Sequence, residues 1–160
     1  MKSIIVSLIF MVAGVSVHAQ TPGDLFHLFK GKKNAEYVHL GRLFFSVLRP
    51  LVCHHDDDPE TRNAIRCVRS IRTLDLEDCD PEVRTQFAMA TNGLRIKGYH
   101  EMVCSSGNGE RTKVLVRQKG NTIRELLLLN AGDDDCSLVQ IKCKVRPETL
   151  ETFVEAMKNN

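Results

Sequence analysis

The fold class is decided by residues 113–145, KVLVRQKGNTIRELLLLNAGDDDCSLVQIKCKV. Apolar runs rich in Val, Ile and Leu at 113–119, 123–130 and 138–145 are separated by Gly120-Asn121 and by 132–135. Short runs of this composition between turn residues are typical of strands, and glycine next to asparagine between two such runs indicates a hairpin. With a further strand expected at 99–104, the stretch predicts a four-strand meander, whose hairpin connections make it antiparallel.

The residues before this meander predict helices and short strands. Asp80-Pro81-Glu82 is the clearest helix start, because aspartate caps, proline fits the first position and glutamate favours the positive helix end. We expect this helix to bury Val83, Phe87 and Ala90 and to stop at Gly93. Other segments predict helices at 24–31, 42–51 (ending at Pro50), 60–67 and from Pro147 onward, and strands at 36–40 and 70–76. The sum is an α+β domain with a mostly antiparallel sheet, a C-terminal four-strand meander and helices packed on one face.

The first nineteen residues have the layout of a secretory signal peptide. Lys2 supplies a positive start, Ile4 to Val15 form the apolar region, and Val17-His18-Ala19 precede the expected cleavage. About twelve apolar residues are too few to span the roughly 30 Å hydrocarbon core of a bilayer. We therefore expect residues 1–19 to be removed, no transmembrane segment to remain, and 20–160 to form a single α+β domain that is periplasmic or secreted.

Composition excludes several classes of protein. The chain has 160 residues, of which 42% are hydrophobic and 26% charged, so it has the material for a buried core. The formal net charge is only +2, whereas a dedicated nucleic-acid-binding protein is normally more basic. No nucleic-acid partner is expected.

Cysteine is the unusual component. An even number of cysteines in an exported chain predicts disulfides, although buried thiols and metal or redox chemistry stay open. Cys136 and Cys143 lie on one expected strand, too far apart along it to pair with each other. The candidates are Cys53, Cys67, Cys79, Cys104, Cys136 and Cys143.

Motifs for catalysis or metal binding are weak. Residues 53–58, Cys-His-His-Asp-Asp-Asp, contain ligand types for zinc or copper but without the spacing that orders them, so a solvated loop is preferred. The acidic run 133–135 does not follow a calcium-loop pattern and is interpreted as a polar turn. No G-x-S-x-G motif is present. We expect no enzyme, no metal and no cofactor.

A basic surface is the one binding feature that the strands suggest. Because side chains alternate along a strand, Val114 and Val116 share one face of theirs, as do Val139 and Ile141 of theirs. An ordinary solvated sheet face is one interpretation of the polar rows. If the basic rows of both strands lie on the open face of the sheet, however, they form a basic patch. There they would recognise an anionic glycan, lipid head group or protein surface. The residues of this expected patch are Lys113, Arg117, Lys119, Lys142 and Lys144.

Several stretches resemble a known family. They are 37–40 running into 42–44, 68–74, 99–102, 114–116, 123–129, and 138–141 leading to the last helix. In the order of their elements and in their local sequence they are similar to the bacterial domain-of-unknown-function family numbered 4252, which consists of exported proteins mainly of Bacteroidetes. The chain departs from that pattern at 142–144, where family members usually have a glycine, and in its many cysteines. The resemblance implies a small exported domain and provides no functional residues.

These observations predict a non-catalytic, exported binding or interaction module of the bacterial envelope that recognises an anionic component. Two alternatives stay open. One is a secreted metal-binding protein or enzyme that uses the loop 53–58. The other is a structural or assembly protein that pairs through a sheet edge.

Overall fold

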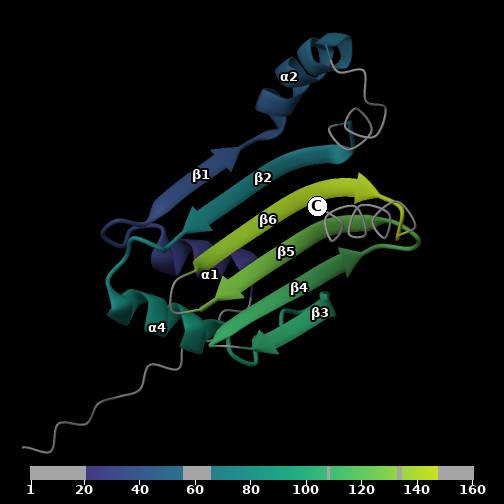
Figure 1. The fold of residues 1–160 in the computed structure, drawn as a ribbon. Coiled ribbons are helices and arrows are strands. Elements are labelled where there is room, and N and C mark those ends of the chain that lie inside the picture. Colours follow the sequence, from purple (N-terminus) through teal and green to yellow (C-terminus); the bar gives the residue numbers. More distant parts are fainter. Residues whose placement is uncertain (1–20, 56–65, 108, 133–134, 148–160) are drawn as a thin grey trace, which may run out of the picture.

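The fold is a single antiparallel sheet with helices (Figure 1). The computed structural model describes residues 21–55, 66–107, 109–132 and 135–147, without the side chains of 49 and 51–55. The six strands lie in the order β1-β2-β6-β5-β4-β3, and every neighbouring pair is antiparallel. Their bounds are β1 Glu36–Leu40, β2 Val68–Asp75, β3 His100–Gly107, β4 Glu110–Gln118, β5 Ile123–Ala131 and β6 Cys136–Val145. The α+β class is confirmed, and β3 to β6 form the expected meander.

Two helices cover part of one face of the sheet, which we call the helix-side face. They are α1 (Pro22–Phe29), which lies behind the sheet in Figure 1, and α4 (Pro81–Thr91), which lies at the lower left end of the sheet in that view. The N-cap of α1 is Thr21, not Asp24 as the sequence suggested. The backbone N–H of Asp24 donates a hydrogen bond to the Thr21 hydroxyl oxygen, and the backbone N–H of Thr21 donates one to the Asp24 carboxylate. This reciprocal pair is a capping box. Helix α4 begins after Asp80, as expected, although the Asp80 side chain makes no capping hydrogen bond.

The main core lies between these helices and the strands beneath them. Leu25, Phe26 and Phe29 of α1 and Phe87 of α4 are buried there, and the Phe29 and Phe87 rings meet edge to face with centroids 5.3 Å apart. Edge-to-face contact suits aromatic rings because a positive ring edge meets a negative ring face. The sheet contributes Leu74, Leu115, Leu127, Leu129 and Leu138, which alternate along their strands with residues of the other face.

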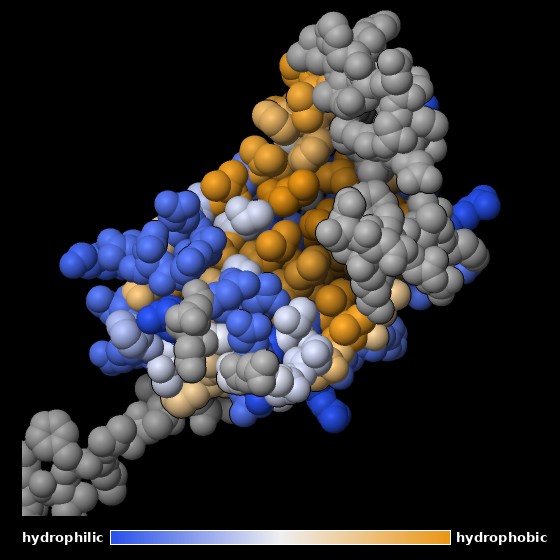
Figure 2. All heavy atoms as spheres, viewed as in Figure 1, coloured by the Kyte–Doolittle hydropathy of each residue, from blue (hydrophilic) through white to orange (hydrophobic). Residues whose placement is uncertain are grey.

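The opposite face of the sheet carries two apolar rows. The register aligns one row across β1, β2, β6, β5 and β4 as Leu40, Ile71, Ile141, Leu126 and Val116. It aligns the other as Val38, Thr73, Val139, Leu128 and Val114. Figure 2 looks onto this face and shows apolar side chains gathered over the middle of the sheet.

The basic rows lie on the face that α1 and α4 partly cover, not on an open face. On the opposite face, Val116 is buried in a second cluster, with Val114 and Ile141 packed against it. Alternation fixes which residues share a face of a strand but does not say which face the helices cover. Here the leucines of the helix-side face are the ones that α1 and α4 bury.

Helix α2 (Arg42–His55) differs from the expectation in length. Pro50 lies inside it, and the helix continues to His55 although proline cannot donate to the preceding turn. Phe45 is buried, whereas Leu43 is 84% exposed and Val47 is 65% exposed. Figure 1 shows that α2 extends away from the end of the sheet. The helices expected at 60–67 and after Pro147 fall largely outside the described residues.

No disulfide joins the cysteines whose side chains are described. Cys79, Cys136 and Cys143 are buried, Cys67 is half-buried and Cys104 is exposed on β3. Cys79 and Cys136 belong to the same core cluster, and the backbone N–H of Leu76 donates to the Cys136 carbonyl at 2.8 Å. The disulfide framework therefore stays a prediction, and the side chain of Cys53 lies outside the described set.

Candidate functional site: a basic groove

The candidate site lies at the end of the sheet that α1 and α4 leave uncovered. Three strands of the helix-side face change there from apolar to charged residues. Lys142 follows Leu138 and Gln140 on β6, Arg72 precedes Leu74 on β2, and Arg117 follows Leu115 on β4. The change leaves a groove of about 880 Å³.

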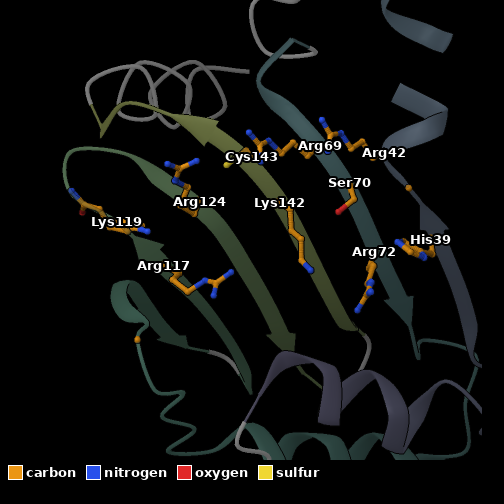
Figure 3. A pocket seen from close by; sticks show the side chains of 13 residues that line it. His39, Arg42, Arg69, Ser70, Arg72, Arg117, Lys119, Arg124, Lys142 and Cys143 are labelled. Carbon is orange, nitrogen blue, oxygen red and sulfur yellow. The ribbon is translucent and has the colours of Figure 1, made fainter. Parts of the chain in front are cut away.

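The groove is lined mainly by cations, so we call it the basic groove. It draws on β1, β2, β4, β5 and β6 and on the start of α2. Figure 3 shows Arg72, Arg117 and Lys142 on the same side of the sheet as α1, with Arg69 and Arg124 farther from that helix. No Asp or Glu is among the described lining residues. The charged or titratable ones are His39, Arg42, Arg69, Arg72, Arg117, Lys119, Arg124 and Lys142.

A buried carboxylate beside the groove holds Arg117, one of the lining residues. Glu125 is only 2% exposed, and its two oxygens accept from Arg117 Nη2 and Gln140 Nε2. Such charge-assisted hydrogen bonds offset the cost of removing a carboxylate from water. The Arg117 guanidinium also lies over the Tyr99 ring, with Cζ 5.7 Å from its centroid. Burial and a hydrogen bond with Glu125 raise the pKa of Tyr99, so this hydroxyl stays protonated. Arg117 is therefore fixed in position and largely neutralised.

The other cations keep their charge available. Within the described residues, no carboxylate lies in ion-pair distance of Arg72, Arg124 or Lys142. The Nε atoms of Arg72 and Arg124 are buried and have no hydrogen-bond partner there. A buried donor without a partner costs free energy that an anionic ligand can offset. The groove thus combines one fixed arginine with several uncompensated cations.

The structure brings together three of the five basic residues that the sequence singled out. Arg117, Lys119 and Lys142 line the basic groove. Lys113 does not, because it is buried next to the core and forms an ion pair with Glu101 at 3.3 Å. Lys144 is exposed but is not a lining residue. The patch was also expected on a face without helices, and this is wrong, since it shares its face with α1 and α4.

Sequence reasoning missed five of the eight charged or titratable residues that line the groove. Arg69 and Arg72 come from β2, Arg124 from β5, His39 from β1 and Arg42 from the start of α2. The arginines of β2 were visible in the strand, but their approach to Lys142 depends on β2 pairing with β6. The pairing of β2 with β6 joins segments about seventy residues apart in the chain, and it is known only once the order of the strands in the sheet is known. No local pattern predicts it.

Catalytic and metal chemistry gain no support from the described residues. No group of three or more His, Cys, Asp and Glu side chains that could hold a metal ion occurs in that part of the chain. Most of the candidate loop 53–58, and the turn residues 133–134, fall outside it. Cys143 lines the groove, but burial and the neighbouring charge of Cys67 raise its pKa to about 11. A thiol that stays protonated at neutral pH is a poor nucleophile.

Comparison with known proteins places the chain in a family. The profile of the domain of unknown function DUF4252 matches residues 29–153, well over half of the sequence. The chain belongs to this family, as its resembling stretches indicated. Neither the search of curated proteins nor the search of solved structures gave a match. Across the described residues, no helix combines the length and apolarity needed to cross a bilayer.

Proposed function

We propose that this protein is an exported, non-catalytic binding domain of the bacterial envelope that holds an anionic ligand in the basic groove. The observation that carries the proposal is the convergence of seven arginines and lysines on one groove whose described lining contains no carboxylate. A chain with a formal net charge of only +2 has no general excess of basic side chains. Concentrated positive charge in a concave site attracts and orients anions.

The signal-peptide pattern of residues 1–19 supports export, and export supports an envelope partner. The even number of cysteines supports the same compartment, in which some of them would pair. These features are independent of the groove.

Charge reversal at Lys142 is the cleanest test of anion binding. Lys142 lines the groove and has no carboxylate partner among the described residues. Arg117→Glu would also reduce binding, but it would place a second carboxylate against the buried Glu125 and lower stability. We expect Lys142→Glu to weaken binding of dextran sulfate by about tenfold or more, a loss of about 1.4 kcal/mol. Affinity is measured by calorimetry at low and at moderate salt.

Lys33→Glu is the matched control. Lys33 is exposed in the turn between α1 and β1, outside the groove, and the substitution makes the same change in net charge. We expect it to leave the affinity within about twofold, because screened surface charges at a distance act weakly. Equal losses in the two variants, or no salt-sensitive binding by the natural protein, would overturn the proposal.

A further inference from the structure

We propose that two copies of this chain join through the open edge of β3. Antiparallel pairing of the two edges brings Cys104 against Cys104 of the second copy, and a disulfide then links them. The inference goes beyond the basic groove and does not depend on it. It is carried by the unprotected edge of β3, by the distance of Cys104 from every other cysteine of its own chain, and by the match of the strand to itself.

The edge of β3 is open to another strand. β3 stands at one end of the strand order, and all eight of its residues are exposed, Met102 by 44% and Val103 by 40%. The strand contains no Lys, Arg or Pro, which are the residues that usually keep an edge from pairing. Its single carboxylate, Glu101, is in an ion pair with Lys113 of β4. Figure 1 shows no helix or strand outside β3 at this edge.

The opposite edge of the sheet is a poorer template. β1 has only five residues, and after Gly41 the chain continues directly into α2. A short edge strand offers few backbone groups to a partner, which is one way in which proteins avoid pairing at an edge. Of the two edges, β3 is therefore the one that can add strands.

Cys104 is too far from the other five cysteines to pair within its own chain. The nearest strand with a cysteine is β6, which lies three strand intervals of about 4.8 Å from β3, or about 14 Å. The remaining cysteines lie near β2 or on α2, which are farther across the sheet. A disulfide allows a Cα separation of at most about 6.8 Å. The cysteines compared are Cys136 and Cys143 of β6, Cys67 and Cys79 near β2, and Cys53 of α2.

The exposed thiol of Cys104 therefore needs a partner in another molecule. Export would place it in an oxidising compartment, where a cysteine left over from pairing within the chain is a candidate for an intermolecular disulfide. A second copy supplies the matching cysteine and the matching open edge together.

The strand is complementary to itself in an antiparallel pair centred on Cys104. A two-fold axis at this residue places Val103 opposite Ser105 of the second copy, and Glu101 opposite Gly107, so no like charges face each other. Opposite residues of an antiparallel pair have Cα atoms about 4.5–5.5 Å apart, which is within the range of a disulfide. From Val103 to Gly107 β3 pairs with β4 in regular register, so the edge around Cys104 has ordinary strand geometry.

The pairing leaves the basic groove open in both copies. Through the register of the intervening strands, Cys104 is aligned with Leu129 of β5 and Leu138 of β6, which belong to the core at the covered end of the sheet. The groove residue Arg117 lies farther along β4, toward the other end. The dimer would therefore carry two basic grooves, one on each copy.

Oxidised glutathione is the oxidant in the test. The thiolate of one Cys104 attacks its disulfide and releases one reduced glutathione, and the thiolate of the second copy attacks the resulting mixed disulfide and releases the other. One S–S bond forms between the copies, two thiols lose their protons, and the two electrons reduce the glutathione disulfide. An oxidised dithiol protein of the exported compartment would take the same part in the cell.

The test follows oxidation of the full mature protein on non-reducing gels and by light scattering. We expect a disulfide-linked dimer, in which mass spectrometry of the peptides identifies Cys104 as the linked residue. Cys104→Ser should form no such dimer.

Val103→Lys and Val103→Thr are a matched pair of variants next to the thiol. Lysine on an edge strand opposes pairing, whereas threonine keeps the β-branched shape and stays neutral. We expect Val103→Lys to form the linked dimer at least about tenfold more slowly than Val103→Thr. An ammonium beside a thiol favours the thiolate and by itself would speed the reaction, so a slower rate cannot come from lower reactivity.

Moving the thiol by one residue tests the register of the two strands. In a Cys104→Ser background, Ser105→Cys places a thiol that is equally exposed in sequence position but offset from its copy by two residues along the strand. The offset is about 6.8 Å, so the two Cα atoms lie about 8 Å apart, beyond the reach of a disulfide. We expect this variant to link at least about tenfold more slowly than the natural protein.

The outcomes decide between pairing of edges and collision of exposed thiols. A natural protein that stays monomeric after oxidation would overturn the proposal, as would a dimer linked through any other cysteine. Equal rates for the two Val103 variants, or linking of Ser105→Cys as fast as that of Cys104, would indicate random collision and would also overturn it. None of these results changes the test of anion binding in the groove, which uses Lys142→Glu.

Discussion

On the helix-side face, the same strands carry the hydrophobic core at one end of the sheet and the basic groove at the other. At the covered end, α1 and α4 seal a leucine and phenylalanine core. At the open end, the same three strands present arginine and lysine to the basic groove. The contrasting pairs on one strand and one face are Leu74 with Arg72, Leu115 with Arg117 and Leu138 with Lys142.

The difference shows that one face of a strand can hold a core and a site in succession. The boundary is formed by buried polar groups, since Glu125 and Gln140 bond to each other between the leucines and the cations. Hydrophobic burial stabilises the covered end, whereas the open end keeps its charges at least partly hydrated. We therefore expect substitutions at the two ends to separate stability from binding.

The largest effect should come from Phe87 at the covered end. Phe87 is fully buried between α4 and the sheet, so Phe87→Ala removes a large apolar side chain and leaves a cavity. We expect the free energy of unfolding in urea to fall by about 3–5 kcal/mol. Arg72→Ala at the open end should cost less than about 1 kcal/mol. If Phe87→Ala does not fold, Phe87→Leu provides a smaller loss to measure, and an equal cost at both ends would refute the contrast.

A smaller effect is expected from Cys143 at the open end, in reduced protein at alkaline pH. Burial raises its pKa from 9.0 to about 11, so the folded state holds this proton more tightly than the unfolded chain does. Its contribution is complete below about pH 9 and is lost as the pH rises toward 11, where stability should fall by roughly 2–3 kcal/mol. Cys143→Ala lacks this titration. If the free energy of unfolding changed with pH in the same way in the natural protein and in Cys143→Ala, the Cys143 thiol would not be shielded from water.

The sequence predicted the covered end of the sheet, with its core, better than the open end with the basic groove. The strands, the hairpins and the helix after Asp80 follow from local signals: turn residues, alternation and a proline at the first helical position. The meander could be predicted for this reason, because each of its hairpins is specified by residues next to each other in the chain. Phe87 was placed in the core by helical spacing alone, and its burial is confirmed.

The groove could be predicted only in part, because it depends on contacts between distant segments. Arg117 and Lys142 were found from alternation within their own strands. Their neighbour Arg72 was not, since β2 lies beside β6 only in the assembled sheet. Lys113 looked equivalent to Arg117 by alternation, yet Glu101 of the edge strand pairs with it next to the core. The alternation of side chains along a strand shows which residues share a face of the sheet. Whether a residue on that face belongs to the core or to the groove depends on whether α1 and α4 cover its part of the strand.

The smallest effect we predict is at Thr21, which begins the helix that covers the core. Thr21→Ala removes the side-chain half of the capping box and should lower the free energy of unfolding by about 1 kcal/mol. Because α1 packs on the covered end, hydrogen exchange should accelerate for amides of α1 and leave those of β6 near Lys142 unchanged. Thr21→Ser keeps the hydroxyl and should retain most of the stability. Faster exchange at both ends would mean that the core and the groove open as one unit, and that the two ends of this face are not energetically separate.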